Sequence, residues 1–311
     1  MTQSATAHHP PAKAVKRPGD RIFTGGTLAA GILILVVLAG VAAFLFKEAL
    51  PTFTADPAEI SGGAGFWSYV WPLVVGTLIA SAIALVIATP LSIGIALYIS
   101  HFASRKLAQP LGYVIDLLAA IPSVVYGLWG IWLATVIRPI FDWLSTYLGF
   151  IPIFAGPASS TGRTMLTAGI VLAVMILPII TSLSREVFLQ TPKLHEEAAL
   201  ALGATRWEMV RMAVLPFGRS GVTSAIMLGL GRALGETMAV AMILSPGALI
   251  ASLVQSGNQT IAAEIALDFP EAAGLRLSTL VAAGLVLFII TLLVNMVARS
   301  IVARSAIKGG R

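Results

Sequence analysis

Residues 70–99 read VWPLVVGTLIASAIALVIATPLSIGIALYI, a run without a charged side chain. A helix needs roughly 20 apolar residues to cross about 30 Å of hydrocarbon. Five other apolar segments are long enough, at residues 24–46, 111–137, 164–184, 221–245 and 277–300. The strands of a membrane β-barrel would instead alternate polar and apolar positions over about ten residues. The sequence therefore predicts an all-α polytopic membrane protein with six transmembrane helices.

The composition supports this class. Of the 311 residues, 57% are hydrophobic and 11% are charged, which is typical of an integral membrane protein. The net charge of +6 comes from basic residues spread over the helix ends, so membrane topology explains it without a nucleic-acid partner. The chain has no Cys and shows no metal-ligand spacing, and we expect no metal site.

The basic residues also predict the orientation, because Lys and Arg near the ends of spanning helices are retained in the cytoplasm. With the N-terminus inside, the outer segments hold only Lys47, Arg138, Arg163 and Arg276. All other Lys and Arg except Arg232 then lie in cytoplasmic segments. We expect both termini to be cytoplasmic.

The chain divides into four predicted parts. Residues 1–20 are expected to be a disordered cytoplasmic tail, and residues 21–69 the first transmembrane helix with an outer loop. Residues 70–305 form the membrane core, and residues 306–311 a cytoplasmic C-terminal tail. A second outer loop, residues 138–163, is too long for a simple turn and is a candidate docking surface for an extracytoplasmic partner.

A cytoplasmic loop at residues 191–216 reads TPKLHEEAALALGATRWEMVRMAVLP. Thr191 is expected to cap a helix that begins at Pro192 and ends at Gly203, a residue that tolerates the left-handed conformation.

A second helix is predicted in the same loop. Thr205 and Glu208 have the spacing of a capping box, and we expect Pro216 to stop the helix that follows. The product is a pair of cytoplasmic helices.

The small residues of the first helix allow it to lie close in a groove of another protein, and Glu197 adds a charge contact. Glu197-Ala198-Ala199, then Gly203, then Val214-Leu215-Pro216 resembles the EAA motif of permease subunits of binding-protein-dependent ABC importers. One position departs from the motif, since Ala213 stands where isoleucine is usual. The resemblance implies that the loop inserts into an ATPase subunit, with coupling residues Glu197, Ala198, Ala199, Gly203, Leu215 and Pro216.

The fifth apolar segment contains two charges, Arg232 and Glu236. A charge at mid-membrane costs several kcal/mol and needs a partner or a water-filled path. Four residues apart on one helix, the two side chains share a face and can pair. One interpretation is a structural salt bridge. The other is an anion pathway, because the guanidinium fork matches tetrahedral oxyanions; Glu236 would then hold Arg232 while the pathway is empty and promote release.

Other polar or helix-bending residues in the spans receive structural interpretations. Asp116, near the inner end of the third span, is interpreted as an interfacial cap or helix contact. Pro90, Pro122 and Pro178 interrupt spans two, three and four, and they permit bends that serve either gating or packing.

Three further segments carry a narrower resemblance. Residues 72–78, 121–130 (IPSVVYGLWG) and 231–240 (GRALGETMAV) are similar to the permeases of phosphate ABC importers, and the similarity extends over residues 20–305. It implies the type I importer (MetI-like) fold in a bacterial inner membrane. The implied partners are a companion permease, PstA, in a heterodimer, two copies of the ATPase PstB, and the phosphate-binding protein PstS.

We therefore expect a non-catalytic subunit that forms, with a second permease, the pathway for inorganic phosphate by alternating access. Arg232 and Glu236 are its expected pathway residues. The chain has no P-loop, so ATP and Mg²⁺ would be bound by the partner ATPase and no cofactor by this chain.

Alternative functions remain open at this point. One arginine does not distinguish phosphate from sulfate or molybdate, so the residues indicate an oxyanion and the resemblance supplies phosphate. An ion-coupled secondary anion carrier would use the same charges, but it needs no ATPase-docking helices, and no inverted repeat is evident. A membrane scaffold would need no charge pair inside the membrane.

Overall fold

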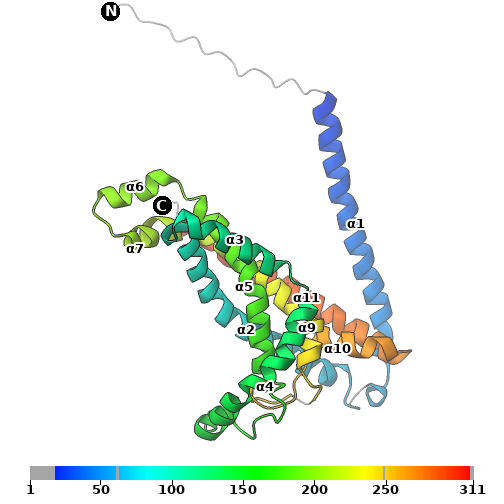
Figure 1. Ribbon diagram of the computed structural model, residues 1–311. Coiled ribbons are helices and arrows are strands. Elements are labelled where there is room, and N and C mark those ends of the chain that lie inside the picture. Colours follow the sequence, from blue (N-terminus) through cyan, green and yellow to red (C-terminus); the bar gives the residue numbers. More distant parts are fainter. Residues whose placement is uncertain (1–17, 61–62, 248, 309–311) are drawn as a thin grey trace, which may run out of the picture. The chain divides into compact units, whose positions relative to one another are not determined.

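Helices make up most of the computed structural model, which describes residues 18–60, 63–247 and 249–308 (Figure 1). Within these ranges six helical segments are long and apolar enough to cross a membrane, which confirms the predicted number. They are Ile22–Thr54, Phe66–Phe102, Ser123–Leu148, Met165–Leu189, Arg206–Leu234 and Leu275–Ser300.

The elements follow one another without a β-strand in the described ranges. The α-helices are α1 (Pro18–Thr54), α2 (Phe66–Leu97), α3 (Arg105–Ala119), α4 (Ser123–Leu148), α5 (Met165–Leu189), α6 (Lys193–Ala201), α7 (Arg206–Met209), α8 (Leu215–Leu234), α9 (Met238–Ile243), α10 (Ile261–Asp268) and α11 (Leu275–Lys308). Two π-helical turns, η2 (Tyr98–Phe102) and η4 (Val210–Val214), and three 3₁₀ turns, η1 (Pro57–Glu59), η3 (Pro152–Phe154) and η5 (Phe269–Glu271), complete the chain.

The chain forms two units, divided between Glu48 and Ala49 within α1. The first unit consists of the N-terminal part of α1 in the described chain. The second contains every other element, and the two units are described separately. Of the predicted tails, residues 1–17 and 309–311 lie outside the described residues.

Helix α5 is the centre of the second unit and the most buried of the candidate spans. It packs against α2, α3, α4, α8 and α9. Ala80, Ala84 and Ala88 on α2 are fully or almost fully buried at helical spacing in the core cluster that α2 shares with α5. Small residues allow helix backbones to approach closely, which matters in a membrane because hydrocarbon provides little hydrophobic force between helices.

Two glycines mark the closest approaches of α2. A Cβ on Gly169 of α5 would lie 2.4 Å from Cγ2 of Ile83, and a Cβ on Gly76 would lie 2.1 Å from the carbonyl oxygen of Gln259. These positions leave no room for a larger residue. The packing of α2 against α5 and against the chain before α10 therefore depends on glycine.

The predicted third span, residues 111–137, was wrong in its bounds. It covers two helices, because α3 ends at Ala119 and α4 begins after Pro122. Pro122 has φ −59° and ψ 140°, and a proline disfavours helical geometry in the residue before it. Pro122 thus separates two helices instead of bending one, whereas Pro90 and Pro178 do lie inside α2 and α5.

The break before α4 has further consequences. The carbonyl of Leu118 accepts a hydrogen bond from the Tyr126 hydroxyl at 2.9 Å, which ties the end of α3 to α4. Because α4 continues to Leu148, the predicted outer loop is shorter than residues 138–163. Asp116 lies on α3 and accepts a hydrogen bond from Ser182 of α5 at 2.8 Å, as expected for a helix contact.

We predict that Gly169→Ala destabilises the protein by about 1–3 kcal/mol, because the added methyl overlaps Ile83 in a packed core. Gly94→Ala is the matched control, since a Cβ at Gly94 meets nothing within 4 Å. Thermal unfolding of the purified complex in one detergent measures both. Equal midpoints for the two variants would show that α2 and α5 are less closely packed than described.

Candidate functional site

The fifth predicted span is broken where its two charges lie. Helix α8 ends at Leu234, Gly235 has φ −97° and ψ 5°, and α9 begins at Met238. Glu236 lies between the helices, is 8% exposed, and its Oε1 accepts the backbone N–H of Ala239 at 3.1 Å. Glu236 therefore provides an acceptor for one of the backbone N–H groups in the first turn of α9, which have no partner within the helix.

The predicted ion pair between Arg232 and Glu236 does not form. Within the described residues no carboxylate lies within 4.0 Å of the Arg232 guanidinium. The i, i+4 geometry requires one continuous helix, and the chain leaves the helix after Leu234. Arg232 instead stands in the last turn of α8 with its side chain exposed, where the helix dipole favours a cation.

The other end of α9 is held by an arginine from a distant segment. Arg163, just before α5, donates to the carbonyls of Met242 at 2.9 Å, Ile243 at 3.1 Å and Leu244 at 3.3 Å. These carbonyls have no partner within a helix that ends there. Arg163 was predicted only as a residue of an outer segment. The sequence gives no local signal for this role, because the contact joins residues about 80 positions apart.

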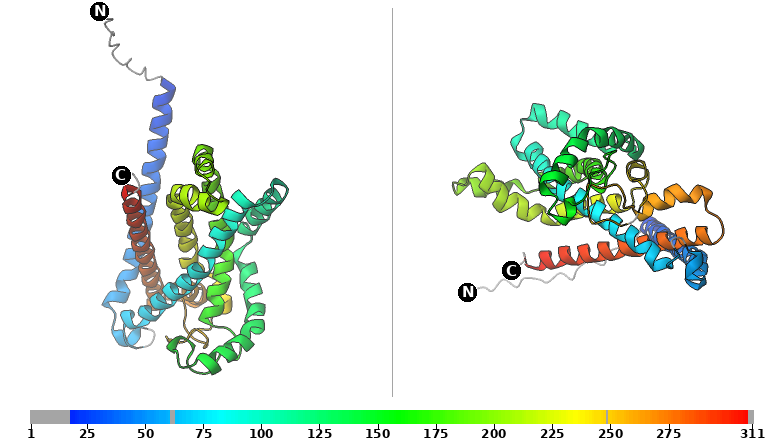
Figure 2. Two further views of the ribbon diagram at one scale, coloured as in Figure 1. Left: turned by 90° about the vertical axis from the view of Figure 1, so that its left-hand side faces the viewer. Right: turned by 90° about the horizontal axis from the view of Figure 1, so that it is seen from below.

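The helix pair α6–α7 lies at the end of the second unit where α5 ends (Figures 1 and 2). Gly203 separates the two helices with φ +85°, as the sequence predicted. The capping box is also confirmed: Thr205 N–H donates to Glu208 Oε2 at 2.7 Å, and Glu208 N–H donates to Thr205 Oγ1 at 3.3 Å.

Two predictions for this loop were wrong. Pro192 occupies the N-cap of α6, and Thr191 has a buried hydroxyl without a hydrogen-bond partner among the described residues. Pro216 does not stop a helix. The chain runs from α7 through the π-helical turn η4, in which Leu215 N–H bonds to the carbonyl of Val210, directly into α8. Pro216 is the second residue of α8, where a missing N–H is tolerated.

The predicted coupling residues divide between two faces. Ala199 is buried in a cluster with Phe188 at the end of α5, Leu97 at the end of α2 and Val210 of η4, and the half-buried Leu215 packs against this cluster. The exposed members are Glu197, Ala198, Gly203 and Pro216.

Large apolar side chains are exposed on the same helix pair, namely Leu194 (77%), Leu202 (89%) and Trp207 (56%). The pair is thus anchored to the spans by one face and presents an apolar surface with a carboxylate on another.

A polar contact reinforces this anchor. Nε2 of His101, in the turn η2 that ends α2, lies 3.5 Å from Oε1 of Glu196 in α6. The other ring nitrogen is 2.7 Å from Ser100 Oγ, so the imidazole is held on both sides. Helix α6 is therefore fixed to α2 as well as to α5.

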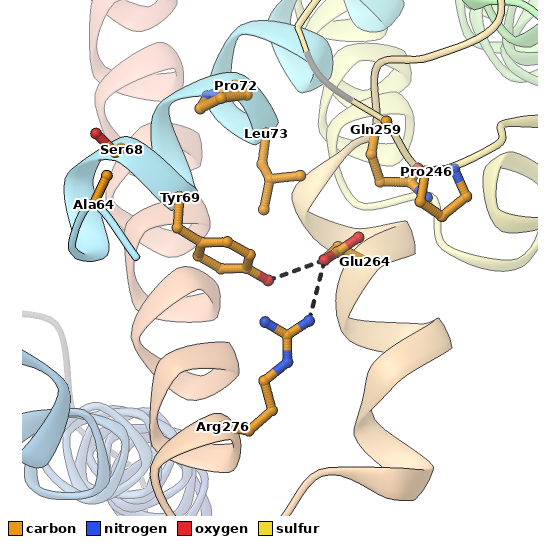
Figure 3. A pocket seen from close by; sticks show the side chains of 10 residues that line it. Ala64, Ser68, Tyr69, Pro72, Leu73, Pro246, Gln259, Glu264 and Arg276 are labelled. Atoms are coloured by element: carbon orange, nitrogen blue, oxygen red, sulfur yellow. Dashed lines mark hydrogen bonds and ion pairs between the residues drawn. The ribbon is translucent and has the colours of Figure 1, made fainter. Parts of the chain in front are cut away.

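A cavity of about 480 Å³ lies near the start of α2, α10 and α11 (Figure 3). Tyr69 donates to Glu264 at 3.1 Å, and Arg276 pairs with Glu264 at 3.4 Å and with Asp268. The guanidinium also stacks over the Tyr69 ring. Glu264 and Asp268, four residues apart in a largely apolar segment, were the available signal for this cluster, which was not among the predicted sites.

Comparison with known proteins shows the class of this chain. Residues 88–306 match the family model described as "Binding-protein-dependent transport system inner membrane component". The chain belongs to this family and is a permease subunit, the non-catalytic multi-pass inner-membrane component of an ABC transport system.

Individual relatives narrow the class. The chain is 45% identical over 298 residues to the phosphate transport system permease protein PstC 2 of Mycobacterium tuberculosis, with 92% of each chain covered. It is 42% identical over 303 residues to PstC of Mesorhizobium japonicum, covering 92% of this chain and 90% of that one. The resemblance to phosphate-importer permeases is thereby confirmed.

Solved structures confirm the predicted fold. An inward-facing structure of the MetNI methionine ABC transporter matches with a TM-score of 0.53 at 18% identity, over 81% of this chain and 99% of that chain. A bacterial ABC transporter that imports the acidic polysaccharide alginate matches with a TM-score of 0.50 at 19% identity, over 91% and 99%.

We predict that Glu236→Ala lowers the free energy of unfolding by about 1–2 kcal/mol, because α9 loses its N-terminal acceptor. Glu236→Gln keeps an acceptor oxygen and should lose less. Thermal unfolding of the purified complex measures both. If the Ala variant unfolds at the wild-type temperature, the contact with Ala239 does not hold α9.

Proposed function

We propose that this chain is the permease subunit of an ATP-driven phosphate importer and forms, with a companion permease, the path of inorganic phosphate into the cytoplasm. The identity of 42–45% to phosphate transport permeases, over nearly the whole chain, supports the substrate. The exposed guanidinium of Arg232 at the break between α8 and α9 is the observation that carries the mechanism.

Arg232 is the proposed contact for the anion. Its charge has no carboxylate partner within 4.0 Å in the described chain, so it remains available for an oxyanion. Arginine stays protonated at physiological pH and binds two oxygens of a tetrahedral anion at once. An intramembrane charge that faces a water-filled path is a usual mark of a transport pathway.

Glu236 has a different role in this proposal from the one that the sequence suggested. It is a positioning residue, which fixes the start of α9 and thereby the chain segment that follows Arg232. Arg163 fixes the end of α9. The two contacts allow non-helical backbone at membrane depth, since its polar groups still find partners inside the protein.

The helix pair α6–α7 is the proposed element that couples this chain to an ATPase. The complex would hold two copies of that ATPase, which would bind ATP and Mg²⁺. Glu197 and Ala198 are exposed for docking, together with Gly203 and Pro216, while Ala199 and Leu215 attach the pair to the spans. The basic residues support an orientation with this end and both termini in the cytoplasm. A phosphate-binding protein would then deliver the anion at the opposite end.

Alternating access follows from this attachment. Movement of the ATPase dimer would be transmitted through Ala199, Leu215 and the His101–Glu196 contact to the ends of α5 and α2. These helices are packed too closely to deform continuously, so they would move as bodies. Discrimination between phosphate and other oxyanions is assigned to the binding protein, because one arginine does not provide it.

We predict that Arg232→Ala lowers phosphate uptake by about ten- to a hundredfold, since charge-assisted hydrogen bonds contribute roughly 1.5–3 kcal/mol. Uptake and binding-protein-stimulated ATPase activity are measured together in proteoliposomes. ATPase activity should be retained. Arg138→Ala, which removes an exposed arginine of α4, is the control. Normal uptake by Arg232→Ala would place the anion path elsewhere.

We also predict that Glu197→Arg weakens assembly with the ATPase several-fold and lowers uptake in proportion. Glu271→Arg makes the same charge change on an exposed residue in η5, far along the chain from the helix pair, and should have no effect. Co-purification of the ATPase with each variant is the measurement. If Glu197→Arg assembles with the ATPase as well as the wild type does, Glu197 does not lie on the docking face.

A further inference from the structure

A second cavity, of about 360 Å³, lies between α3 and α5. It lies near the segments that attach the helix pair α6–α7. Arg185 precedes the end of α5 by about one turn, and Arg105 is the third residue after η2. The residues lining it include Arg105, Arg185, Gln109, Tyr113 and Asp116. None of them belongs to the proposed pathway or to the proposed ATPase-docking face.

The charge of this pocket is positive and only partly compensated. Two guanidinium groups face one carboxylate, and neither arginine has a carboxylate within 4.0 Å among the described residues. Asp116 already accepts a hydrogen bond from Ser182. Moreover, Nε of Arg185 is buried and has no hydrogen-bond partner in the described chain. A buried donor normally has an acceptor, so the protein by itself does not satisfy this guanidinium.

Neighbouring residues hold Arg185 in place and add donors. Gly112 of α3 leaves room for the guanidinium, since a Cβ there would lie 3.2 Å from its Cζ. Gln109 Nε2 donates to the Tyr113 hydroxyl at 3.4 Å, which leaves the phenolic O–H free to donate into the pocket. Two guanidinium forks and a hydroxyl match a group with several oxygen acceptors and a negative charge.

We propose that this pocket binds a phosphate group at the coupling end of the permease. Two sources have the required chemistry. Inorganic phosphate would reach the pocket from the aqueous side, where the product of transport accumulates. An anionic phospholipid headgroup would reach it along α3. The apolar residues Leu111, Val114 and Leu118 of this helix are exposed, as expected for an amphipathic helix at a membrane interface.

Protection of an introduced thiol tests the proposal. The chain has no Cys, so Ala108→Cys places the single thiol of this subunit in the lining of the pocket. The assembled complex, with cysteine-free partner subunits, is placed in nanodiscs of phosphatidylcholine or phosphatidylglycerol without ATP or binding protein. The rate of maleimide labelling is measured with and without inorganic phosphate. Gln190→Cys, exposed after the end of α5 and outside the pocket, is the control thiol.

Arg105→Gln and Arg185→Gln test the site in the same background. Arg105 is exposed, so its replacement leaves folding intact, and Arg211→Gln removes an exposed arginine elsewhere. For free phosphate we expect slower labelling in phosphatidylcholine, by about tenfold at ten times the dissociation constant. For a lipid we expect slower labelling in phosphatidylglycerol without phosphate. In both cases the protection is lost in Arg105→Gln and in Arg185→Gln, and it is retained in Arg211→Gln.

Other outcomes overturn the proposal. If Ala108→Cys is labelled at the same rate under all conditions, the pocket binds no phosphate group. If the protection persists in Arg105→Gln or in Arg185→Gln, or extends to Gln190→Cys, the phosphate group does not bind at this site. Because labelling is followed without transport, the result is independent of Arg232. Normal uptake by Arg232→Ala together with protection of the Ala108→Cys thiol would contradict only the proposed pathway. Reduced uptake by Arg232→Ala without protection of that thiol would contradict only the proposed pocket.

Discussion

Close packing of α5 is the constraint on which the second unit depends. Hydrocarbon gives apolar helices little reason to associate, so their association rests on contacts between surfaces that fit. Gly169 of α5 and the alanines of α2 provide such surfaces, and α3, α4, α8 and α9 use the remaining faces of the same helix. A change in the position of α5 would therefore reach each of these neighbours. The helix pair α6–α7 attaches at its end, through Ala199 and Phe188, so the proposed docking of an ATPase on this pair would act on α5.

The break between α8 and α9 shows how irregular backbone is accommodated in a membrane segment. Each end of α9 exposes polar groups that hydrocarbon does not satisfy. Glu236 supplies an acceptor at one end, and Arg163 supplies donors at the other. This arrangement occupies Glu236 and leaves Arg232 without a carboxylate partner in the described chain. In a continuous helix Arg232 and Glu236 could have neutralised each other. The break instead gives Glu236 a structural contact and leaves the guanidinium of Arg232 separate, as an anion pathway requires.

The coupling end of the unit combines mechanical and electrostatic features. The His101–Glu196 contact and the cluster around Ala199 join α6 to α2 and α5. The pocket of Arg105 and Arg185 lies between α3 and α5, about one helical turn before the loop that leads into α6. Occupation of this pocket by a phosphate group would stiffen the contact between α3 and α5. Because α5 also packs against α8, which carries Arg232, the proposed phosphate site and the proposed pathway share one helix as a neighbour.

The sequence by itself determined the membrane class, the number of spans, the family and the helix pair after α5 with its capping box and Gly203. These features depend on local composition and spacing, which each segment carries within itself. The tertiary structure alone decided where the spans break and which charges meet. The apolar windows did not reveal the break at Pro122 or the end of α8 at Leu234, because each break lies inside a window that is apolar overall. Nor did spacing reveal that Arg163 caps α9 or that Arg185 lies against Gly112, since such contacts join residues brought together only by helix packing.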